Sequence, residues 1–461
     1  MPHYSSTTIC ALATAPGVGA IAVIRVSGSQ AIEICSTIFF GKDLNKVASH
    51  TAHFGTIRAK DKIVDEVLVT VFKGKKSFTG ENSVEISTHG SPYIQQQVIQ
   101  LLIDKGAIMA QPGEFTLRAF LNGKLDLSQA EAVADVIAAN SETSHALAMS
   151  QMRGGFSAEI QQLRTQLIHF ASLIELELDF GEEDVEFANR ADLKELVAQL
   201  NAVLFSLIHS FDYGNVIKSG VPVAIIGSPN VGKSTLLNAL LNEERAIVSD
   251  IAGTTRDVIE DEIILDGISF RFIDTAGIRA TSDSIETLGI EKTYQKLKQA
   301  AIVMLLVDAA TIARKELLSN IQNIKEKIGE KQKHLIVVAN KMDKVASKEA
   351  IETIFEGIEN VIFVAAREKQ NITTIKTHLV QCIQQGASNN DVVVTNARHY
   401  EALTKANDSL LKVLEGLDTN ITGDFLAMDI RQALHHLGEI TGNITTDDLL
   451  DNIFSKFCIG K

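Results

Sequence analysis

Cysteine is scarce in this sequence, and its spacing excludes two common uses of the thiol. The 461 residues contain four cysteines, and no two of them stand at a Cys-x-x-Cys or Cys/His ligand spacing. Disulfide frameworks and structural zinc sites depend on such pairs or clusters. The cysteine pattern therefore fits a protein of the reducing cytosol and gives no support for structural zinc. The cysteines are Cys10, Cys35, Cys382 and Cys458.

Long hydrophobic runs are absent as well. No stretch reaches the ~18 consecutive apolar residues that indicate a membrane-spanning helix. The opening residues, Met-Pro-His-Tyr-Ser-Ser, lack the pattern of a signal peptide. We therefore expect a soluble, cytoplasmic protein with no membrane partner.

Positive charge is in deficit. The chain carries 43 Lys and Arg against 57 Asp and Glu, which gives a net charge of −14. This balance disfavours a broad basic surface for nucleic acid, so any RNA contact is expected to be local or supplied by a partner. With 45% apolar residues and no low-complexity tract, the chain is predicted to be globular throughout. Its length suggests about two to four domains.

A glycine-rich motif is the strongest positive signal. Gly227-x-x-x-x-Gly232-Lys233-Ser234 follows the strand-like run Val221–Ile226 and precedes the helical segment Thr235–Leu241. Strand, glycine loop and helix in this order are typical of a P-loop, in which backbone N–H groups and the helix N-terminus bind phosphate. We expect Lys233 to reach the outer phosphates and the Ser234 hydroxyl to bind Mg²⁺.

Two later segments are predicted to complete the phosphate side of the site. Asp250-Ile-Ala-Gly253-Thr254-Thr255 offers threonines that can ligate Mg²⁺ and sense the γ-phosphate. A predicted strand, Ser269–Ile273, leads to Asp274-Thr275-Ala276-Gly277. There Asp274 is placed to bind Mg²⁺ through water, and Gly277 lets a backbone N–H approach the γ-phosphate.

The nucleotide base is predicted to be guanine. The predicted strand Leu335–Val338 leads to Asn340-Lys341-Met342-Asp343. Asp343 would accept from guanine N1–H and N2–H₂, whereas adenine would leave the carboxylate unpaired at a cost of a few kcal/mol. Ala365-Ala366-Arg367 is a degenerate version of the usual guanine-contacting Ser-Ala-Lys loop. The predicted GTP-binding residues are Asn230, Val231, Gly232, Lys233, Ser234, Thr235, Ser249, Asp250, Ile251, Ala252, Gly253, Thr254, Thr255, Asp274, Thr275, Ala276, Gly277, Asn340, Lys341 and Asp343.

The device that hydrolyses GTP is not the Ras-like one. In such sites a glutamine directly after Asp-x-x-Gly orients the water, and an arginine finger neutralises charge. Here Ile278 occupies the glutamine position. Two hypotheses follow: Asn230 with backbone carbonyls of residues 249–254 holds a monovalent cation near the phosphates, and Glu286 orients the water. Arg256 and Arg279 are competing finger candidates.

The first ~120 residues are predicted to form a mixed α+β domain. Predicted strands are Thr8–Thr14, Ala20–Val26, Val64–Phe72 and Val84–Ser87. A helix from Ser91 to about Lys105 is predicted to end at Gly106. Polar residues of this region, namely Arg25, Glu81, Glu85, His89 and Lys124, are candidates for a ligand site.

From about Leu125 the pattern becomes helical. Ser128-Gln-Ala-Glu131 is predicted to be a capping box, with helical periodicity continuing to about Asp179. A helix over about Arg190–Phe211 is predicted to end in a linker that comprises Asp212–Gly214 and Lys218–Gly220.

Helices are predicted again after the nucleotide motifs, over Ala397–Leu417, Asp424–Ile440 and Thr446–Phe457. We favour one helical domain into which the nucleotide module is inserted, since domain termini usually lie close together. Two separate bundles are the alternative. The predicted domains are residues 1–122 (N-terminal α+β), 123–216 (first helical part), 217–383 (P-loop GTPase, Ras-like) and 384–461 (second helical part), in a multidomain α/β protein.

With these residues in view, the whole chain resembles the MnmE (TrmE) family of bacterial tRNA-modification GTPases. The most specific matches are Arg118-Ala-Phe-Leu-Asn-Gly-Lys-Leu-Asp126 and the terminal Cys458-Ile-Gly-Lys461. Further matches are Ala15-Pro-Gly, Ile24-Arg25-Val-Ser-Gly28, Ser77-Phe-Thr-Gly-Glu81, Pro112-Gly-Glu-Phe115 and Gly253-Thr-Thr-Arg-Asp257.

The resemblance implies a function that the motifs alone do not. The family acts with the flavoprotein GidA (MnmG), in a heterotetramer, to add an aminomethyl or carboxymethylaminomethyl group at C5 of the tRNA wobble uridine. Its N-terminal domain resembles folate-binding aminomethyltransferase domains, forms the homodimer and binds a formyl-tetrahydrofolate, such as 5-formyl-tetrahydrofolate, as one-carbon source. Its GTPase domains dimerise across their nucleotide faces in the presence of K⁺.

The same resemblance implies roles for single residues. Arg25, Glu85 and Lys124 match the folate contacts, with Lys461 nearby. Glu286 matches the catalytic glutamate. The K⁺ site is matched by Asn230, Ser249, Ile251 and Thr254, and the Mg²⁺ ligands by Ser234 and Thr255.

Cys458 has two interpretations: a small side chain packed beside Phe457, or a catalytic thiolate at the folate carbon. Three rival functions stay open. They are a ribosome-assembly GTPase of the Era or Der kind, a folate-dependent transferase whose GTPase is only regulatory, and a structural switch without chemistry of its own.

Overall fold

The computed structural model describes residues 7–179, 190–242, 261–273, 299–328, 333–384, 392–419 and 421–460. The chain falls into two compact units. Unit 1 comprises Met1–Ala138, Ala148–Leu204 and Glu401–Lys461, and unit 2 comprises Ala139–Leu147 and Phe205–Tyr400. The predicted domain boundaries at residues 122, 216 and 383 stay predictions. None of the described helices is long and apolar enough to cross a membrane.

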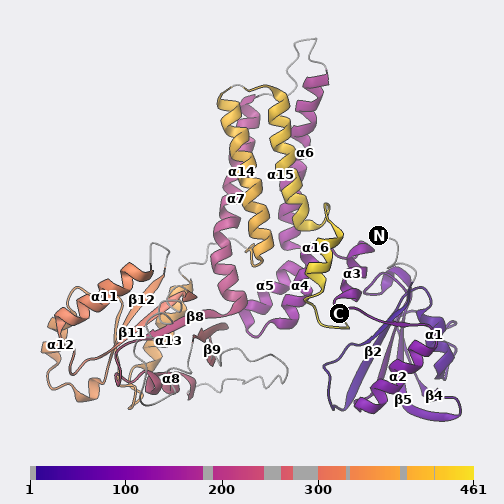
Figure 1. The fold of residues 1–461 in the computed structure, drawn as a ribbon, viewed down its shortest axis with the longest axis horizontal. Coiled ribbons are helices and arrows are strands. Elements are labelled where there is room, and N and C mark those ends of the chain that lie inside the picture. The colour runs from indigo at the N-terminus through magenta and orange to yellow at the C-terminus, as the bar shows by residue number, and fades with distance from the viewer. Residues whose placement is uncertain are drawn as a thin grey trace. The chain divides into compact units, whose positions relative to one another are not determined.

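Unit 1 contains a mostly antiparallel sheet with the strand order β3-β4-β5-β6-β2-β1-β7 (Figure 1). Its strands β2, β5 and β6 alternate buried and accessible residues, as expected of a sheet that is covered on one face. Helices α1 (Ala31–Ile38) and α2 (Pro92–Asp104) supply that cover. The strands are β1 (Ile9–Leu12), β2 (Ile21–Ser27), β3 (Phe39–Phe40), β4 (Thr51–Ala59), β5 (Lys62–Phe72), β6 (Ser83–His89) and β7 (Ile108–Met109).

The core of this sheet lies between its covered face and the two helices. Val67, Val69 and Val71 of β5 point into it together with Cys35 of α1 and Leu102 of α2. The predicted strands and the predicted helix from Ser91 are confirmed, with ends shifted by a few residues. Gly106 follows α2 at φ +103°, a conformation that favours glycine, as the C-cap prediction requires.

The capping box lies two residues before its predicted place. Helix α4 (Leu127–Ala138) is capped by Asp126, whose Oδ1 accepts from the Gln129 N–H at 2.9 Å, while Gln129 Oε1 accepts from the Asp126 N–H at 3.0 Å. Ser128, the predicted cap, donates its hydroxyl to Asp126 Oδ1 at 2.7 Å. The prediction was wrong because Asp126 and Gln129 make the reciprocal hydrogen bonds of the box, so the helix begins at Leu127, before Ser128.

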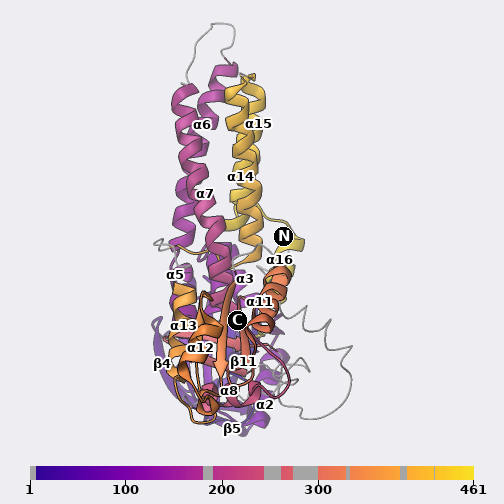
Figure 2. The same ribbon diagram turned by 90° about the vertical axis from the view of Figure 1, so that its left-hand side faces the viewer.

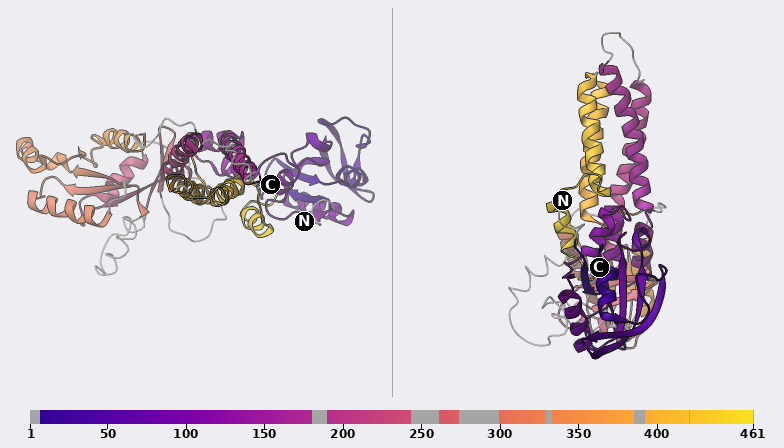
Figure 3. Two further views of the ribbon diagram at one scale, coloured as in Figure 1. Left: turned by 90° about the horizontal axis from the view of Figure 1, so that it is seen from above. Right: turned by 90° about the vertical axis from the view of Figure 1, so that its right-hand side faces the viewer.

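The helical stretch predicted to extend to about Asp179 consists of α4, α5 (Glu142–Met152) and α6 (Gly155–Asp179). Gly154, at φ +91°, separates the last two. In unit 1, α6 packs along α15 (Gly423–Thr441), and Arg431 donates to Glu175 Oε1 at 2.5 Å and 2.9 Å. Figures 2 and 3 show these helices side by side. Helices from both sides of the nucleotide module therefore form one bundle, as the insertion model predicts.

The other helices of the C-terminal part are α14 (Ala397–Asp418) and α16 (Asp447–Phe454), and α3 (Glu114–Leu121) belongs to the N-terminal part. Lys194 of α7 (Arg190–Ser219) pairs with Asp418 of α14, and α16 packs on α3. The three predicted C-terminal helices are confirmed. α16 ends at Phe454 rather than Phe457.

The predicted linker at residues 212–220 is wrong. Helix α7 runs without a break over Arg190–Ser219 and ends at Gly220, whose φ is +80°. Gly214 is not a hinge: a Cβ there would lie 2.2 Å from the carbonyl oxygen of Val394. The glycine is therefore explained by the close approach of a distant backbone segment, which sequence alone does not show.

Unit 2 is built on a sheet with the order β13-β12-β11-β8-β10-β9, parallel except for the β9–β10 pair. Its strands are β8 (Val221–Ile226), β9 (Asp261–Leu265), β10 (Ile268–Phe272), β11 (Ile302–Asp308), β12 (His334–Asn340) and β13 (Val361–Phe363). Helices α8 (Lys233–Asn242) and α13 (Ile372–Gln384) pack on one face, and α11 (Arg314–Ile328) and α12 (Lys348–Phe355) on the other. The predicted multidomain α/β fold with an inserted P-loop unit is confirmed.

Candidate functional site: a P-loop and a charged sheet face

The predicted P-loop joins β8 to α8. A Cβ at Gly227 would lie 2.2 Å from the Leu306 carbonyl oxygen, so the loop can leave the strand against β11 only with glycine here. Gly232 has φ +99°, and a Cβ there would lie 2.5 Å from Asn340 Nδ2. Both glycines of the motif are therefore required by the packing of the loop on neighbouring strands.

Lys233 stands at the start of α8 and closes the loop. Its ammonium donates to the carbonyl oxygens of Gly227 at 2.5 Å and Ser228 at 3.2 Å. Burial lowers the pKa of Lys233 below its ordinary value, because the charged form is partly desolvated. A lysine next to the N-terminal N–H groups of a helix is the arrangement that binds phosphate.

Asn230 adopts the left-handed conformation at φ +64° and has an exposed side chain. It borders a cavity of about 400 Å³ together with Gly227, Asp308 and Lys341. Its side chain is therefore accessible at the loop's outer edge, where the sequence predicts a cation ligand. Val231 is buried, and Ser234 and Thr235 lie in the first turn of α8.

The predicted base-binding segment follows β12. Lys341 has φ +66°, and its Nζ pairs with Asp308 Oδ2 at 2.7 Å. Asp343 lies exposed in the short 3₁₀ helix η2 (Met342–Lys344). The carboxyl ends of β8, β11 and β12 thus meet at one edge of the sheet, the usual ligand edge of a parallel sheet.

Asn340 does more than the sequence indicated. It is 3% exposed, its Nδ2 donates to the Val231 carbonyl at 2.8 Å, and its Oδ1 accepts from the Ala366 N–H at 3.0 Å. One buried amide thereby connects the P-loop to the degenerate loop at Ala365–Arg367. The Asn-Lys-x-Asp spacing indicated the segment, but not this bridging role.

Several predicted site residues lie outside the described residues. Among the nucleotide and cation contacts these are Ser249, Asp250, Ile251, Ala252, Gly253, Thr254, Thr255, Asp274, Thr275, Ala276 and Gly277. Ile278, the finger candidates Arg256 and Arg279, the predicted catalytic Glu286 and the terminal Lys461 are outside them too.

A second cluster of predicted residues lies on the accessible face of the unit 1 sheet. Arg25 of β2 and Glu85 of β6 are register partners, and two nitrogens of Arg25 contact Glu85 Oε1 at 3.0 Å and 2.9 Å. The guanidinium carbon lies 5.7 Å from the ring centroid of both Phe78 and Phe115. Phe115 is fully buried, whereas Phe78 is exposed, so the face offers a charged pair beside one accessible aromatic ring, which suits a flat polar ligand.

The C-terminal tail reaches the same face. Arg25 Nη1 donates to the Gly460 carbonyl oxygen at 3.5 Å. A Cβ at Gly460 would lie 2.2 Å from the Leu12 carbonyl oxygen, and the Gly113 N–H donates to the Cys458 carbonyl at 3.4 Å. Cys458 itself is exposed. The structure thus brings Arg25, Glu85 and the tail together, whereas Lys124 donates its ammonium to the Lys75 carbonyl at 3.0 Å.

A buried charge cluster, which the sequence reasoning missed, supports this face. Arg118 is 1% exposed and pairs with Glu114 at 2.8 Å and with Glu81 at 3.2 Å. Glu81 in turn accepts from the Ser27 hydroxyl at 3.0 Å. The cluster connects helix α3 to the Ser77–Glu81 loop and to β2. The available signal was Glu114 four residues before Arg118, in a helix whose other residues are mostly apolar (Phe115, Leu117, Ala119, Phe120).

His89 is a further residue of the predicted ligand group. Its Nδ1 lies 2.7 Å from Asp65 Oδ1, and its backbone N–H donates to Asp65 Oδ2 at 2.8 Å. Asp65 is 7% exposed, so the carboxylate fixes both the end of β6 and the ring of His89.

Comparison with known proteins matches both parts of the chain. A family model described as "GTP-binding protein TrmE N-terminus" matches residues 8–124, and one described as "MnmE helical domain" matches residues 127–458. A "tRNA modification GTPase MnmE" of Cytophaga hutchinsonii is 55% identical over 455 residues, with 98% of each chain covered. The protein of the same name from Christiangramia forsetii is 57% identical over 469 residues, covering 98% of this chain and 99% of its own.

Among solved structures, Aquifex aeolicus Era bound to GDP·AlF₄⁻ shares 26% identity over 41% of this chain and 66% of its own, with a TM-score of 0.27. A TM-score this low carries no weight beside the relatives that match along almost the whole length. The chain therefore belongs to the MnmE family of tRNA modification GTPases, and it is a GTPase with a role in tRNA modification.

Proposed function

We propose that this chain is a K⁺-dependent GTPase that acts with GidA (MnmG) on the wobble uridine of certain tRNAs. It would install the 5-aminomethyl or 5-carboxymethylaminomethyl group with 5-formyl-tetrahydrofolate, or a related folate, as one-carbon carrier. The observation that carries the folate part is the meeting of Arg25, Glu85 and the C-terminal tail on one sheet face.

The folate proposal rests on the fit between ligand and residues. A pterin ring is flat and carries hydrogen-bond donors and acceptors on its edge, which suits a carboxylate and a guanidinium beside an accessible aromatic ring, here Phe78. Glu85 and Arg25 offer those groups next to Phe78 and Phe115. Lys461 follows Gly460 directly and would meet the acidic end of the ligand, as Lys124 would.

Titration calorimetry with 5-formyl-tetrahydrofolate tests this site. Arg25→Ala should abolish detectable binding, because it removes the partner of Glu85 and the contact to the tail. Arg58→Ala is the matched control, since Arg58 lies over Phe40 on the same sheet without contacting Glu85. Equal affinity of Arg25→Ala and the wild type would refute the folate site.

The cation proposal rests on Asn230. Its exposed amide stands at the edge of the loop that carries Lys233, where a K⁺ ion would take the place of an arginine finger. Ser249, Ile251 and Thr254 would supply the other ligands, Ser234 and Thr255 would hold Mg²⁺, and Glu286 would orient the water.

Steady-state GTP turnover in K⁺ and in Na⁺ is the direct measurement. Turnover should rise strongly with K⁺ and little with Na⁺, and Asn230→Ala should remove the difference. Asn360→Ala is a matched control, because Asn360 also has a positive φ (+55°) and is exposed. Equal rates in the two salts would eliminate the cation mechanism. Glu286→Ala should abolish hydrolysis in either salt, as should chelation of Mg²⁺.

The partner proposal is a homodimer that forms a heterotetramer with GidA. Co-purification with GidA and nucleoside analysis of tRNA from a deletion strain test it. The modified wobble uridine should disappear in the deletion strain and return with the wild-type gene. Modification that survives Glu286→Ala would favour a merely regulatory GTPase. Unchanged modification after deletion of residues 458–461 would remove any direct role of the tail and of Cys458.

The ribosome-assembly rival has less support. It needs a KH-like RNA-binding module after the GTPase unit, and such a module contains strands. Over the described residues 392–419 and 421–460 the secondary structure is helices and turns, without a strand.

A further inference from the structure

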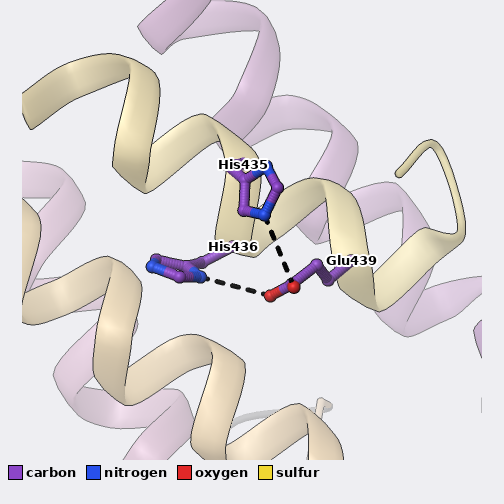
Figure 4. A group of neighbouring side chains, drawn as sticks. All are labelled: His435, His436 and Glu439. Atoms are coloured by element: carbon purple, nitrogen blue, oxygen red, sulfur yellow. Dashed lines mark hydrogen bonds and ion pairs between the residues drawn. The ribbon is translucent and has the colours of Figure 1, made fainter. Parts of the chain in front are cut away.

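Two histidines and a glutamate converge on the surface of α15, and none of them is among the residues of the two sites described above. His435 Nε2 lies 3.5 Å from Glu439 Oε1, and His436 Nδ1 lies 3.2 Å from Glu439 Oε2. Figure 4 shows both imidazole rings directed towards the one carboxylate. One donor atom from each residue lies within 4.8 Å of the other two.

The helix itself produces this convergence. Residues three and four positions before a given residue lie next to it on the helix surface, one turn towards the N-terminus. His435 and His436 stand at these two positions relative to Glu439. Two residues adjacent in sequence, which otherwise point about 100° apart on a helix, therefore meet the same carboxylate from its two sides.

The donor set has a definite chemical preference. Neutral imidazole nitrogens and a carboxylate oxygen are ligands of Zn²⁺ and related transition metals, whereas Mg²⁺ and Ca²⁺ prefer oxygen ligands alone. Tetrahedral Zn²⁺ bonds of about 2.0–2.2 Å place its donors roughly 3.3–3.5 Å apart. The two observed His–Glu separations, 3.5 Å and 3.2 Å, are close to this size but involve different oxygens of Glu439, so side-chain rotation would have to bring one oxygen and both imidazole nitrogens around a single ion.

We propose that His435, His436 and Glu439 bind a divalent transition-metal ion, with Zn²⁺ as the natural occupant. Three protein ligands leave a fourth position for water or for a ligand from another molecule. His436 and Glu439 are partly buried, with 23% and 36% of their side chains exposed, which limits the rotamer entropy lost on binding. Lys405 of α14 is a nearby cation: it donates to Glu401 at 2.7 Å, and its pKa is raised first by Glu401 and also by the charge of Glu439.

Zinc titration of the full-length protein, with excess Mg²⁺ to occupy the nucleotide site, tests the proposal. A chromophoric chelator competes for the metal and reports stoichiometry and affinity. The wild type should bind one Zn²⁺ equivalent that is lost in the double variant His435→Ala, Glu439→Gln. Each single variant, including His436→Ala, should lower the affinity for this zinc ion by about tenfold or more. Even residues that only hydrogen-bond to a metal ligand change metal affinity by about 10–100-fold when they are replaced.

The control is His169→Ala, which removes an exposed histidine from α6 and leaves the cluster intact. It should retain the full equivalent. Cys458 is an exposed thiol that can bind zinc by itself, so Cys458→Ser should also retain it. Co²⁺ substitution gives a second readout, because a tetrahedral Co²⁺ site absorbs in the visible and an octahedral aquo ion hardly does.

GTP turnover and circular dichroism should be unchanged in the variants of His435, His436, Glu439 and His169, because none of these residues belongs to the nucleotide site. A wild type that binds no more zinc than the double variant would overturn the proposal. The proposal would also be overturned if the bound zinc ion were lost in Cys458→Ser and retained in the histidine variants.

Discussion

The two sheets of this protein place their functional side chains in different positions. In unit 2, β11 is buried along almost its whole length, with only Asp308 at its end partly exposed. In unit 1, β5 alternates buried and exposed residues, and β2 and β6 present Arg25 and Glu85 on the accessible face. One sheet has its charged groups at the strand ends and the other has them in the middle of a face.

The difference follows from what covers each sheet. Parallel strands need crossover helices, and these cover both faces, so polar groups can reach a ligand only from the loops at the carboxyl ends. An antiparallel sheet connected by short loops leaves one face free for side chains at every second position. The phosphate site is accordingly made of backbone and loop residues, and the proposed folate site of strand side chains.

The largest effect is expected from the buried charge cluster of Arg118, Glu114 and Glu81. Arg118→Ala would leave Glu114, 4% exposed, and Glu81 without their common cation. Removing one partner of a buried ion pair costs about 3–5 kcal/mol, because the remaining charge is uncompensated. Urea denaturation monitored by circular dichroism should show the loss, whereas Arg58→Ala should cost less than about 1 kcal/mol. Similar urea midpoints for Arg118→Ala and Arg58→Ala would show that the stability of the fold does not depend on the cluster.

The next effect concerns the loop at the strand ends. Lys233→Ala should lower kcat/KM for GTP by about 100–1,000-fold, the usual cost of losing one donor to developing charge. Lys341→Ala, which removes the pair with Asp308, should act mainly on KM for GTP, because it lies on the base side. A variant of Lys233 with nearly normal turnover would contradict the phosphate role of the loop.

A matched pair of leucines compares the two sheets directly. Leu306 of β11 is fully buried, and Leu68 of β5 is 45% exposed. Leu306→Ala should cost about 2–5 kcal/mol through lost burial and a cavity. Leu68→Ala should cost less than about 0.5 kcal/mol, because the substitution of an exposed side chain removes little buried apolar surface. The shift in urea midpoint measures both, and equal shifts would show that the face of β5 is covered in solution.

The smallest effect concerns the thiols. Burial raises the pKa of Cys10 from 9.0 to about 11 and raises the pKa of Cys35 as well, whereas Cys458 is exposed. Iodoacetamide should label Cys458 well before the other two, and urea should remove the difference, as mass spectrometry of peptides would report. Because the pKa of the Cys10 thiol is higher in the folded than in the unfolded state, protonation of the thiol stabilises the folded state. The stability that Cys10 contributes is therefore present below pH 9 and lost as the pH rises towards 11.

What the sequence determined by itself was local. The spacing of Gly227, Gly232 and Lys233 predicted strand, loop and helix because each glycine and the lysine act on a short stretch of backbone. Hydrophobic periodicity located the C-terminal helices for the same reason. Even local chemistry was ambiguous where two patterns overlapped, since Asp126-x-x-Gln129 and Ser128-x-x-Glu131 both satisfy a capping box.

Tertiary structure decided whatever depends on residues far apart in the chain. The sequence around Gly214 predicts a linker, whereas the structure shows that the backbone of Val394 packs against this glycine. Asn340 connects two loops because its side chain hydrogen-bonds to both Val231 and Ala366. Arg25 met Gly460 because packing brings the last residues back to the first sheet. Such contacts depend on which surfaces fit together in three dimensions, and that information is distributed over the whole chain rather than written in any one segment.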